Sequence, residues 1–115
     1  MPAVSVYGIR NCDTISKART WLDSHGVAYD FHDYKVAGVD PDDLKRWVKQ
    51  LGWEVLLNRA GTTFRKLADA DKEGLTEAKA IQLMLAQPSM IKRPVLEKGK
   101  TLLVGFKVEA YQALI

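Results

Sequence analysis

The pattern of apolar and polar residues predicts strands at both ends of the chain and helices in the middle. Residues 3–8 form a short apolar run of the kind that builds a buried strand, and Gly8 ends it. Residues 12–25 then repeat apolar side chains at helical spacing. Residues 27–34 place aromatic side chains on one face of a second strand. A strand, a helix and a strand in this order predict a βαβ unit with a right-handed crossover.

The segment over residues 40–92 has the spacing of helices. Asp40 followed by Pro41 is typical of a helix start, because an acidic cap and a proline at the first position satisfy or remove unpaired N–H groups. Residues 53–57 indicate a further helical turn, and Thr76 is a candidate cap for another helix. On that helix we expect four residues to face inward, namely Ala78, Ile81, Met84 and Leu85.

The chain returns to strands near its end. We expect strands at residues 94–96 and 101–104, joined by a turn at residues 97–100 and followed by a terminal amphipathic helix. The order of elements predicts one α/β domain over residues 1–115, with a mixed four-stranded sheet. The helices of residues 40–92 then form an insertion between the second and third strands.

Composition and charge set limits on the function. The 115 residues suffice for one domain, and the formal net charge of +3 is too small to indicate a nucleic-acid partner. The longest apolar runs are far shorter than a membrane-spanning helix, so we expect no membrane segment. A single cysteine excludes an internal disulfide. Together with an N-terminus that lacks a secretory signal, this predicts a reducing, cytoplasmic setting.

Cys12 is the candidate with the clearest chemical role. It follows an apolar strand and a glycine-containing turn, and it stands where a helix is expected to begin. Unpaired N–H groups and the helix dipole at such a start favour an anion, so they lower the pKa of a thiol and make its sulfur nucleophilic. Asn11 and Thr14 are candidate hydrogen-bond donors to the thiolate. The alternative is a small buried hydrophobic residue, which is the usual role of a lone cysteine.

The absence of a second cysteine constrains the mechanism. Ile15 stands where thioredoxin-type motifs carry their second cysteine, so Cys12 has no internal thiol to release it. An external thiol must do so, and glutathione is the obvious one in the cytosol. Because glutathione is an anion, its site would favour arginines. Arg59 lies in an expected turn and Arg93 precedes Pro94, which holds Arg93 extended, but taken alone each arginine is more typical of a solvated surface.

Short motifs spread over nearly the whole chain carry a family resemblance. They are Tyr7-Gly8, Asn11-Cys12-Asp13-Thr14, Lys17-Ala18, Trp21-Leu22, Phe31-x-Asp33-Tyr34, Leu56-Leu57-Asn58-Arg59, Lys92-Arg93-Pro94 and Val104-Gly105-Phe106. Each string is weak by itself. Their order and spacing together resemble the ArsC family of glutaredoxin-like proteins, and most of all its YffB-type branch beside the arsenate reductases and the Spx regulators.

The resemblance implies a thioredoxin-like fold with a helical insertion. It implies that Cys12 matches the family's nucleophile, and that Arg59 and Arg93 match two arginines that bind the oxyanion in arsenate reductases. It also implies a cis peptide bond between Arg93 and Pro94, beside the cysteine. Arsenate reductases of this family carry a third arginine beyond the last strands, where this chain has only Lys107 nearby. Lysine lacks the bidentate guanidinium fork, which argues against arsenate as the physiological substrate.

The leading hypothesis is a cytoplasmic, monomeric, glutathione-dependent thiol oxidoreductase. Cys12 attacks a disulfide or an oxyanion, and glutathione releases the adduct, with glutaredoxin as a candidate partner. The expected substrate- or glutathione-binding residues are Asn11, Thr14, Arg59, Arg93, Pro94 and Lys107.

Two alternatives stay open. One is an arsenate reductase of the glutathione and glutaredoxin type, with Lys107 in the place of the missing arginine. The other is a non-enzymatic regulator that binds RNA polymerase as Spx does, although Ile15 excludes the two-cysteine switch of the redox-sensing Spx proteins. We expect neither a metal nor a bound organic cofactor, because His25 and His32 have no second cysteine to complete a site.

Overall fold

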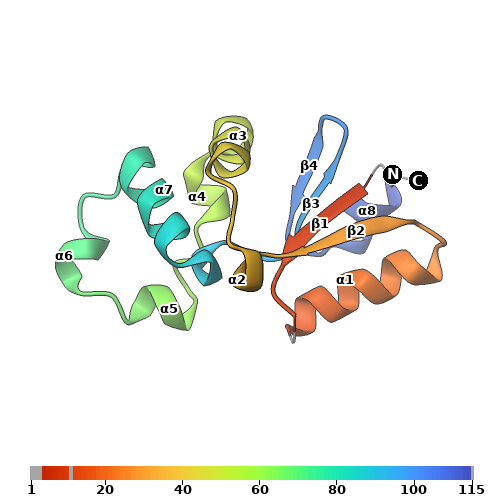
Figure 1. Cartoon of the computed structure of the whole chain (residues 1–115), viewed down its shortest axis with the longest axis horizontal. Coiled ribbons are helices and arrows are strands. Elements are labelled where there is room, and N and C mark those ends of the chain that lie inside the picture. The colour runs from red at the N-terminus through yellow and green to blue at the C-terminus, as the bar shows by residue number, and fades with distance from the viewer. Residues whose placement is uncertain (1–3, 11, 115) are drawn as a thin grey trace. The chain divides into compact units, whose positions relative to one another are not determined.

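The computed structural model describes residues 4–10 and 12–114. Their contacts divide the chain into two compact units, one made of residues 1–37 with 93–115 and the other of residues 38–92. We call the first the sheet unit and the second the helical unit, after the elements that each contains (Figure 1). The single domain over residues 1–115 stays a prediction.

Within its described residues, the sheet unit contains a mixed four-stranded sheet in the order β2-β1-β3-β4 (Figure 1). β1 pairs parallel with β2 and antiparallel with β3, and β3 pairs antiparallel with β4. The helices α2 to α7 fall between β2 and β3 in the chain. This confirms the predicted thioredoxin-like α/β fold. The strands are β1 (Val4–Gly8), β2 (Tyr29–Asp33), β3 (Val95–Lys98) and β4 (Thr101–Val104).

One apolar cluster of the sheet unit lies on a single face of the sheet. Val4 and Val6 alternate along β1 and therefore point to the same face. Two helices, α1 (Asp13–Ser24) and α8 (Val108–Gln112), pack against that face. The buried residues of this cluster are Val4, Val6, Ala18, Leu22, Leu96 and Tyr111. α1 is thus fixed along the sheet, and its first turn lies just beyond the end of β1.

The second and third strands differ from the prediction at both ends, because β2 begins at Tyr29 rather than at residue 27 and β3 spans Val95–Lys98 rather than residues 94–96. The second strand ends at Asp33, one residue early, because the Asp33 carboxylate accepts a hydrogen bond from the Lys35 amide at 3.0 Å and starts the short helix α2 (Tyr34–Ala37). The hairpin turn is shorter than expected. Lys98 pairs with Thr101, so only Gly99 and Lys100 remain between the strands, and Gly99 has the positive φ of 59° that such a turn requires.

The helical unit confirms helices in the middle of the chain. Thr76 caps α7 as predicted, since its side-chain oxygen accepts a hydrogen bond from the Lys79 amide at 3.2 Å. The pattern did not predict α6, which lies between exposed residues and has no buried side chain. The elements are α3 (Pro41–Leu51), α4 (Trp53–Leu56), α5 (Thr62–Arg65), α6 (Asp69–Lys72), α7 (Glu77–Ala86) and a 3-10 turn, Pro88–Met90.

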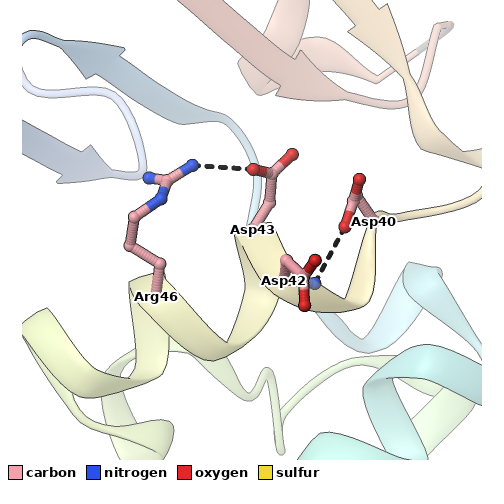
Figure 2. Close-up of polar contacts among 4 residues, drawn as sticks. All are labelled: Asp40, Asp42, Asp43 and Arg46. Atoms are coloured by element: carbon pink, nitrogen blue, oxygen red, sulfur yellow. Dashed lines mark hydrogen bonds and ion pairs between the residues drawn. The ribbon is translucent and has the colours of Figure 1, made fainter.

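The start of α3 matches the predicted cap. The Asp40 carboxylate accepts a hydrogen bond from the Asp42 amide at 2.8 Å, and Pro41 occupies the first helical position (Figure 2). On the same helix Asp43 and Arg46 form an ion pair at 2.7 Å (Figure 2). Both side chains of that pair are partly exposed, so we expect it to contribute only about 0.3 kcal/mol to stability.

The buried face of α7 differs from the prediction. Met84 is buried as expected, but Ala78 is exposed and Ala80 takes the buried place. Ile81 and Leu85 are half-buried. Most positions of α7 are apolar, so the helical period alone does not select which side faces the core. The prediction of Ala78 as an inward-facing residue was therefore wrong.

Candidate active site

Cys12 stands at the start of α1, in the position that the sequence predicts. It is the N-cap residue with an extended backbone (φ −109°, ψ 131°), and its carbonyl accepts a hydrogen bond from the Ser16 amide at 2.9 Å. Its side chain is only half-buried, so a substrate can reach the sulfur. Gly8 sets this position, because a Cβ there would overlap the end of the buried Ile15 side chain. The close approach of β1 and α1 fixes the first helical turn.

Charges and dipoles in the sheet unit favour the thiolate form of Cys12. Burial alone would raise the pKa of this thiol. The amides of Ile15 and Thr14 and the guanidinium of Arg93 outweigh that effect, and the pKa of Cys12 lies below its ordinary value. The Cys12 side chain makes no cap hydrogen bond, so the two amides act on the sulfur as dipoles. Arg93 both donates a hydrogen bond to the sulfur and attracts its charge.

The pairing of β1 with β3 explains why Arg93 reaches Cys12. Tyr7 of β1 pairs with Val95 of β3, so the end of β1 and the beginning of β3 meet at the same edge of the sheet. Arg93 precedes β3 at that edge. The Arg93–Pro94 peptide bond is cis, as the family resemblance implies. The buried Pro94 is held in place because its carbonyl accepts a hydrogen bond from the Gly105 amide at 2.8 Å.

Tyr34 and Asp33 are neighbours of the site that belong to one of the family motifs but were not predicted as site residues. Burial raises the pKa of the Tyr34 hydroxyl far above its usual range, and the charges of Cys12 and Asp33 add to this while Arg93 opposes it. Tyr34 therefore stays a neutral phenol beside the thiolate. The Asp33 carboxylate also accepts a hydrogen bond from the Arg10 amide at 3.3 Å, which ties the loop before Cys12 to the end of β2. The expected topology could have indicated these two residues, because β1 and β2 are parallel and parallel strands end at the same edge of a sheet.

Arg59 belongs to the helical unit. It is exposed and lies in a turn after Asn58, whose amide donates a hydrogen bond to the Met90 carbonyl at 2.7 Å. The guanidinium carbon of Arg59 lies 5.9 Å from the centre of the Trp53 ring, a cation–π distance. Its turn position is as expected. The role of Arg59 toward Cys12 stays a prediction.

Three further residues were expected at the site, namely Thr14, Lys107 and Asn11. Thr14 lies in the first turn of α1, and it is the Thr14 amide that acts on the sulfur. Lys107 is exposed at the N-cap of α8, and it is not one of the described groups that shift the pKa of Cys12. Asn11 lies outside the described residues.

Both histidines make local packing contacts. His25 follows the end of α1, its ring stacks on Trp21 with centroids 3.9 Å apart, and its Nδ1 lies 2.8 Å from the Trp21 carbonyl oxygen. His32 stacks on Tyr7 at 4.6 Å. The part of the chain that the structure describes contains no cluster of three or more histidine, cysteine, aspartate or glutamate residues suited to a metal ion. Among the described helices, none has the length and apolar character needed to cross a membrane.

Comparisons with known proteins agree with this arrangement. A solved structure of a protein called YFFB is 66% identical to this chain, with a TM-score of 0.93 and coverage of 96% of both chains. An arsenate reductase (ArsC) related protein from Brucella melitensis is 57% identical over 96% of this chain and 92% of its own, with a TM-score of 0.78. The global transcriptional regulator Spx of Streptococcus mutans is 26% identical over 97% of this chain and 82% of its own length. The family model of the ArsC family matches residues 7–114, and the chain therefore belongs to the ArsC family.

Proposed function

We propose that this protein is a thiol oxidoreductase that uses Cys12 as its one nucleophile and a glutathione-type thiol as its external reductant. The observation that carries the proposal is the half-exposed Cys12 sulfur at the start of α1, with Arg93 beside it and a pKa below the ordinary value. A lowered pKa raises the fraction of thiolate at a given pH, and the thiolate is the attacking species.

The reaction on a mixed disulfide proceeds in two exchanges. The Cys12 thiolate attacks the glutathione sulfur of the substrate, the substrate disulfide breaks, and the substrate leaves as a thiolate that takes a proton from water. A second glutathione thiolate then attacks the Cys12 adduct, which returns Cys12 and forms glutathione disulfide. Overall the substrate sulfur is reduced from disulfide to thiol, and the sulfur of the second glutathione is oxidised from thiol to disulfide. Arg93 and the amides of Thr14 and Ile15 stabilise Cys12 as nucleophile and again as leaving group.

The remaining expected residues have proposed binding roles. Arg59 and Arg93 are proposed to hold an anionic substrate or the carboxylates of glutathione, and Lys107 is a further exposed cation proposed to bind the substrate. Pro94 shapes the surface beside Arg93, and Asn11 is a further proposed hydrogen-bond donor. We propose that the protein works as a monomer in the reducing cytoplasm, with glutaredoxin as a candidate partner.

Intact mass after incubation with oxidised glutathione tests the proposal directly. We expect one glutathione adduct on the native protein and none on the Cys12→Ser variant. Reduction of a small mixed disulfide, coupled to NADPH oxidation by glutathione reductase, should depend on Cys12 in the same way. If no adduct forms, or if Cys12→Ser retains full activity, Cys12 is not the nucleophile.

Arsenate reduction is the second candidate, because a 57% identical relative is called arsenate reductase related. In that case the Cys12 thiolate would attack the oxyanion, and Lys107 would act in the place of the missing arginine. Arsenate-dependent NADPH oxidation in the presence of glutathione and glutaredoxin would support it. We expect no such turnover, since lysine cannot form the bidentate contact of an arginine.

The name of the Spx relative suggests a third candidate, a regulatory contact with the transcription machinery. Purified RNA polymerase offered to the immobilised protein distinguishes it from the enzyme. Retention that survives Cys12→Ser would favour a regulator over a redox enzyme, and no retention would remove this candidate.

A further inference from the structure

A groove runs along the outer side of α1 in the sheet unit. It encloses about 510 Å³, a size typical of ligand sites. One wall is formed by two neighbouring rows of side chains along α1, and the residues within each row are four positions apart. The other wall comes from the connection between β4 and α8. The lining residues include Ser16, Lys17, Thr20, Trp21, His25 and Phe106.

The floor of this groove is aromatic and held from below. Trp21 packs edge-on against the buried Tyr111 with ring centroids 5.6 Å apart, and Phe106 packs edge-on against the same ring at 4.8 Å. His25 stacks on Trp21 at 3.9 Å. Tyr111 belongs to the apolar core, so the floor is preformed rather than assembled by a ligand. A large apolar side chain gains most from such a surface.

The rim of the groove favours a ligand that also carries negative charge. Hydroxyl groups and Lys17 line it, and the lining residues include no carboxylate. Lys107 stands in the chain between Phe106 and Val108 and is exposed. A ligand with an apolar side chain and an acidic group matches this combination.

The Ser16 end of the groove lies one helical turn from Cys12. Cys12 precedes Ser16 by one helical turn on the same row, and the two residues are joined by the hydrogen bond from the Ser16 amide to the Cys12 carbonyl. A turn advances by about 5.4 Å. An extended peptide covers that distance in about two residues. A peptide bonded through its own cysteine to Cys12 would therefore place a residue about two positions away at the Ser16 end of the groove, from which a large side chain extends toward the aromatic floor.

We propose that this groove binds a large apolar side chain of an acidic peptide segment whose cysteine forms the mixed disulfide with Cys12. The inference rests on the proposed function and names its substrate class, which is protein or peptide disulfides rather than glutathione disulfides alone. The Cys12 thiolate attacks the sulfur of the peptide cysteine, and the peptide's former disulfide partner leaves as a thiolate. A small external thiolate then attacks the Cys12 sulfur and releases the peptide as a thiolate. A second molecule of that thiolate attacks the small thiol's sulfur in the new mixed disulfide, which returns the Cys12 thiolate and forms the disulfide of the two small thiols.

Peptides activated with thionitrobenzoate test this proposal, because the leaving thiolate is coloured. Each probe carries an aspartate and one cysteine in mixed disulfide with thionitrobenzoate. The two probes of a pair differ only in having tryptophan or glycine two residues from the cysteine. One pair has this residue on the N-terminal side of the cysteine, and a second pair has it on the C-terminal side. For one of the two placements we expect the tryptophan peptide to react about tenfold faster than its glycine partner at a limiting protein concentration. Equal rates for both pairs would overturn the inference.

A pair of matched variants locates the effect. Thr20→Glu adds a carboxylate in the middle of the groove, while Thr101→Glu adds the same group at an exposed position of β4 outside it. The ratio of tryptophan to glycine rates should fall to about one in Thr20→Glu and stay unchanged in Thr101→Glu. An equal fall in both variants would assign the preference to general charge and overturn the groove.

The same experiment separates the two levels of the argument. If the native protein releases thionitrobenzoate from neither peptide faster than free cysteine does, the proposed function fails. If it reacts quickly but without preference for tryptophan, only the groove fails. Rate ratios are used because Thr20→Glu also alters the field at the start of α1, which affects both peptides alike.

Discussion

The beginnings of α1 and α3 solve the same physical problem in opposite ways. Each helix starts after an extended N-cap residue, and each has N–H groups without a partner inside the helix. At α3 the protein supplies the partner itself, because the Asp40 carboxylate accepts the Asp42 amide and Pro41 has no N–H to satisfy (Figure 2). At α1 the cap is Cys12, whose side chain makes no cap hydrogen bond.

The difference teaches which helix start is available for chemistry. At α3 the Asp40 carboxylate accepts the Asp42 amide and stabilises the fold, so that amide is not available to a ligand. At α1 the free dipole acts on the sulfur instead, and together with Arg93 it lowers the pKa of Cys12. We infer that the second arrangement gives up helix stability in exchange for a reactive thiolate. Each prediction below exchanges or removes one part of this comparison.

The largest effect is expected from Cys12→Ser. Serine has a similar size but a hydroxyl that does not ionise near neutral pH, so disulfide reduction should fall to the rate measured without protein. Asp40→Ala, at the other helix start, should keep full activity when assayed well below its unfolding temperature. Activity that survives in Cys12→Ser, or that disappears in Asp40→Ala, would contradict the division between a reactive and a structural start.

Arg93→Gln should reduce reactivity severalfold without abolishing it. Because the pKa of Cys12 lies below its ordinary value, the alkylation rate of Cys12 should reach its plateau at a lower pH than that of free cysteine. Loss of the Arg93 charge removes a cause that lowers this pKa, so the midpoint moves to higher pH. Iodoacetamide rates measured from pH 5 to 10 follow the shift.

Arg10→Gln is the matched control for Arg93→Gln. Arg10 is an exposed arginine in the same unit, and its charge is not one of the described groups that shift the pKa of Cys12. Its midpoint should stay at the native value. Equal shifts in both variants would show that general positive charge, and not the position of Arg93, favours the thiolate.

Local patterns in the sequence sufficed where structure is determined locally. The acidic residue before Pro41 predicts the cap of α3, and Cys12 after a strand and a turn predicts a thiol at a helix start. Both depend on residues within a few positions of each other. The strands of the four-stranded sheet were also predicted from separate short patterns, because each strand carries its own pattern of apolar residues.

Features that arise from pairing between distant segments were harder to predict. Tyr34 and Arg93 meet at Cys12 only because β2 and β3 both pair with β1, a register that no local pattern contains. The side of α7 that is buried depends on its packing neighbours, which is why Ala78 was placed wrongly. Arg59 was assigned from a family motif alone, and its place in the helical unit leaves its role to be tested by mutation.

Asp40→Ala should destabilise the protein by about 1 kcal/mol, the usual cost of losing a side-chain cap. The Asp42 amide then loses its acceptor, while the rest of α3 is unchanged. Urea unfolding followed by circular dichroism measures the difference, with Asp69→Ala as a control. Asp69 is an exposed aspartate of the helical unit that follows its helix's N-cap, and it makes no side-chain cap hydrogen bond there. A cost in Asp69→Ala equal to that in Asp40→Ala would mean that loss of negative charge, and not of the cap, explains the effect.

Cys12→Asp carries the comparison to its smallest and most direct effect, because it gives α1 the kind of cap that α3 has. A carboxylate can accept the unpaired amides and can face Arg93, so we expect a gain of about 0.5–1 kcal/mol in unfolding free energy at pH 7, with complete loss of activity. The gain should disappear as the pH falls below about 4, where the carboxyl group takes up its proton. Cys12→Ala removes the thiol without adding an acceptor and should show no gain. If Cys12→Asp is no more stable than Cys12→Ala, the cysteine at the N-cap of α1 does not lower the stability of the protein.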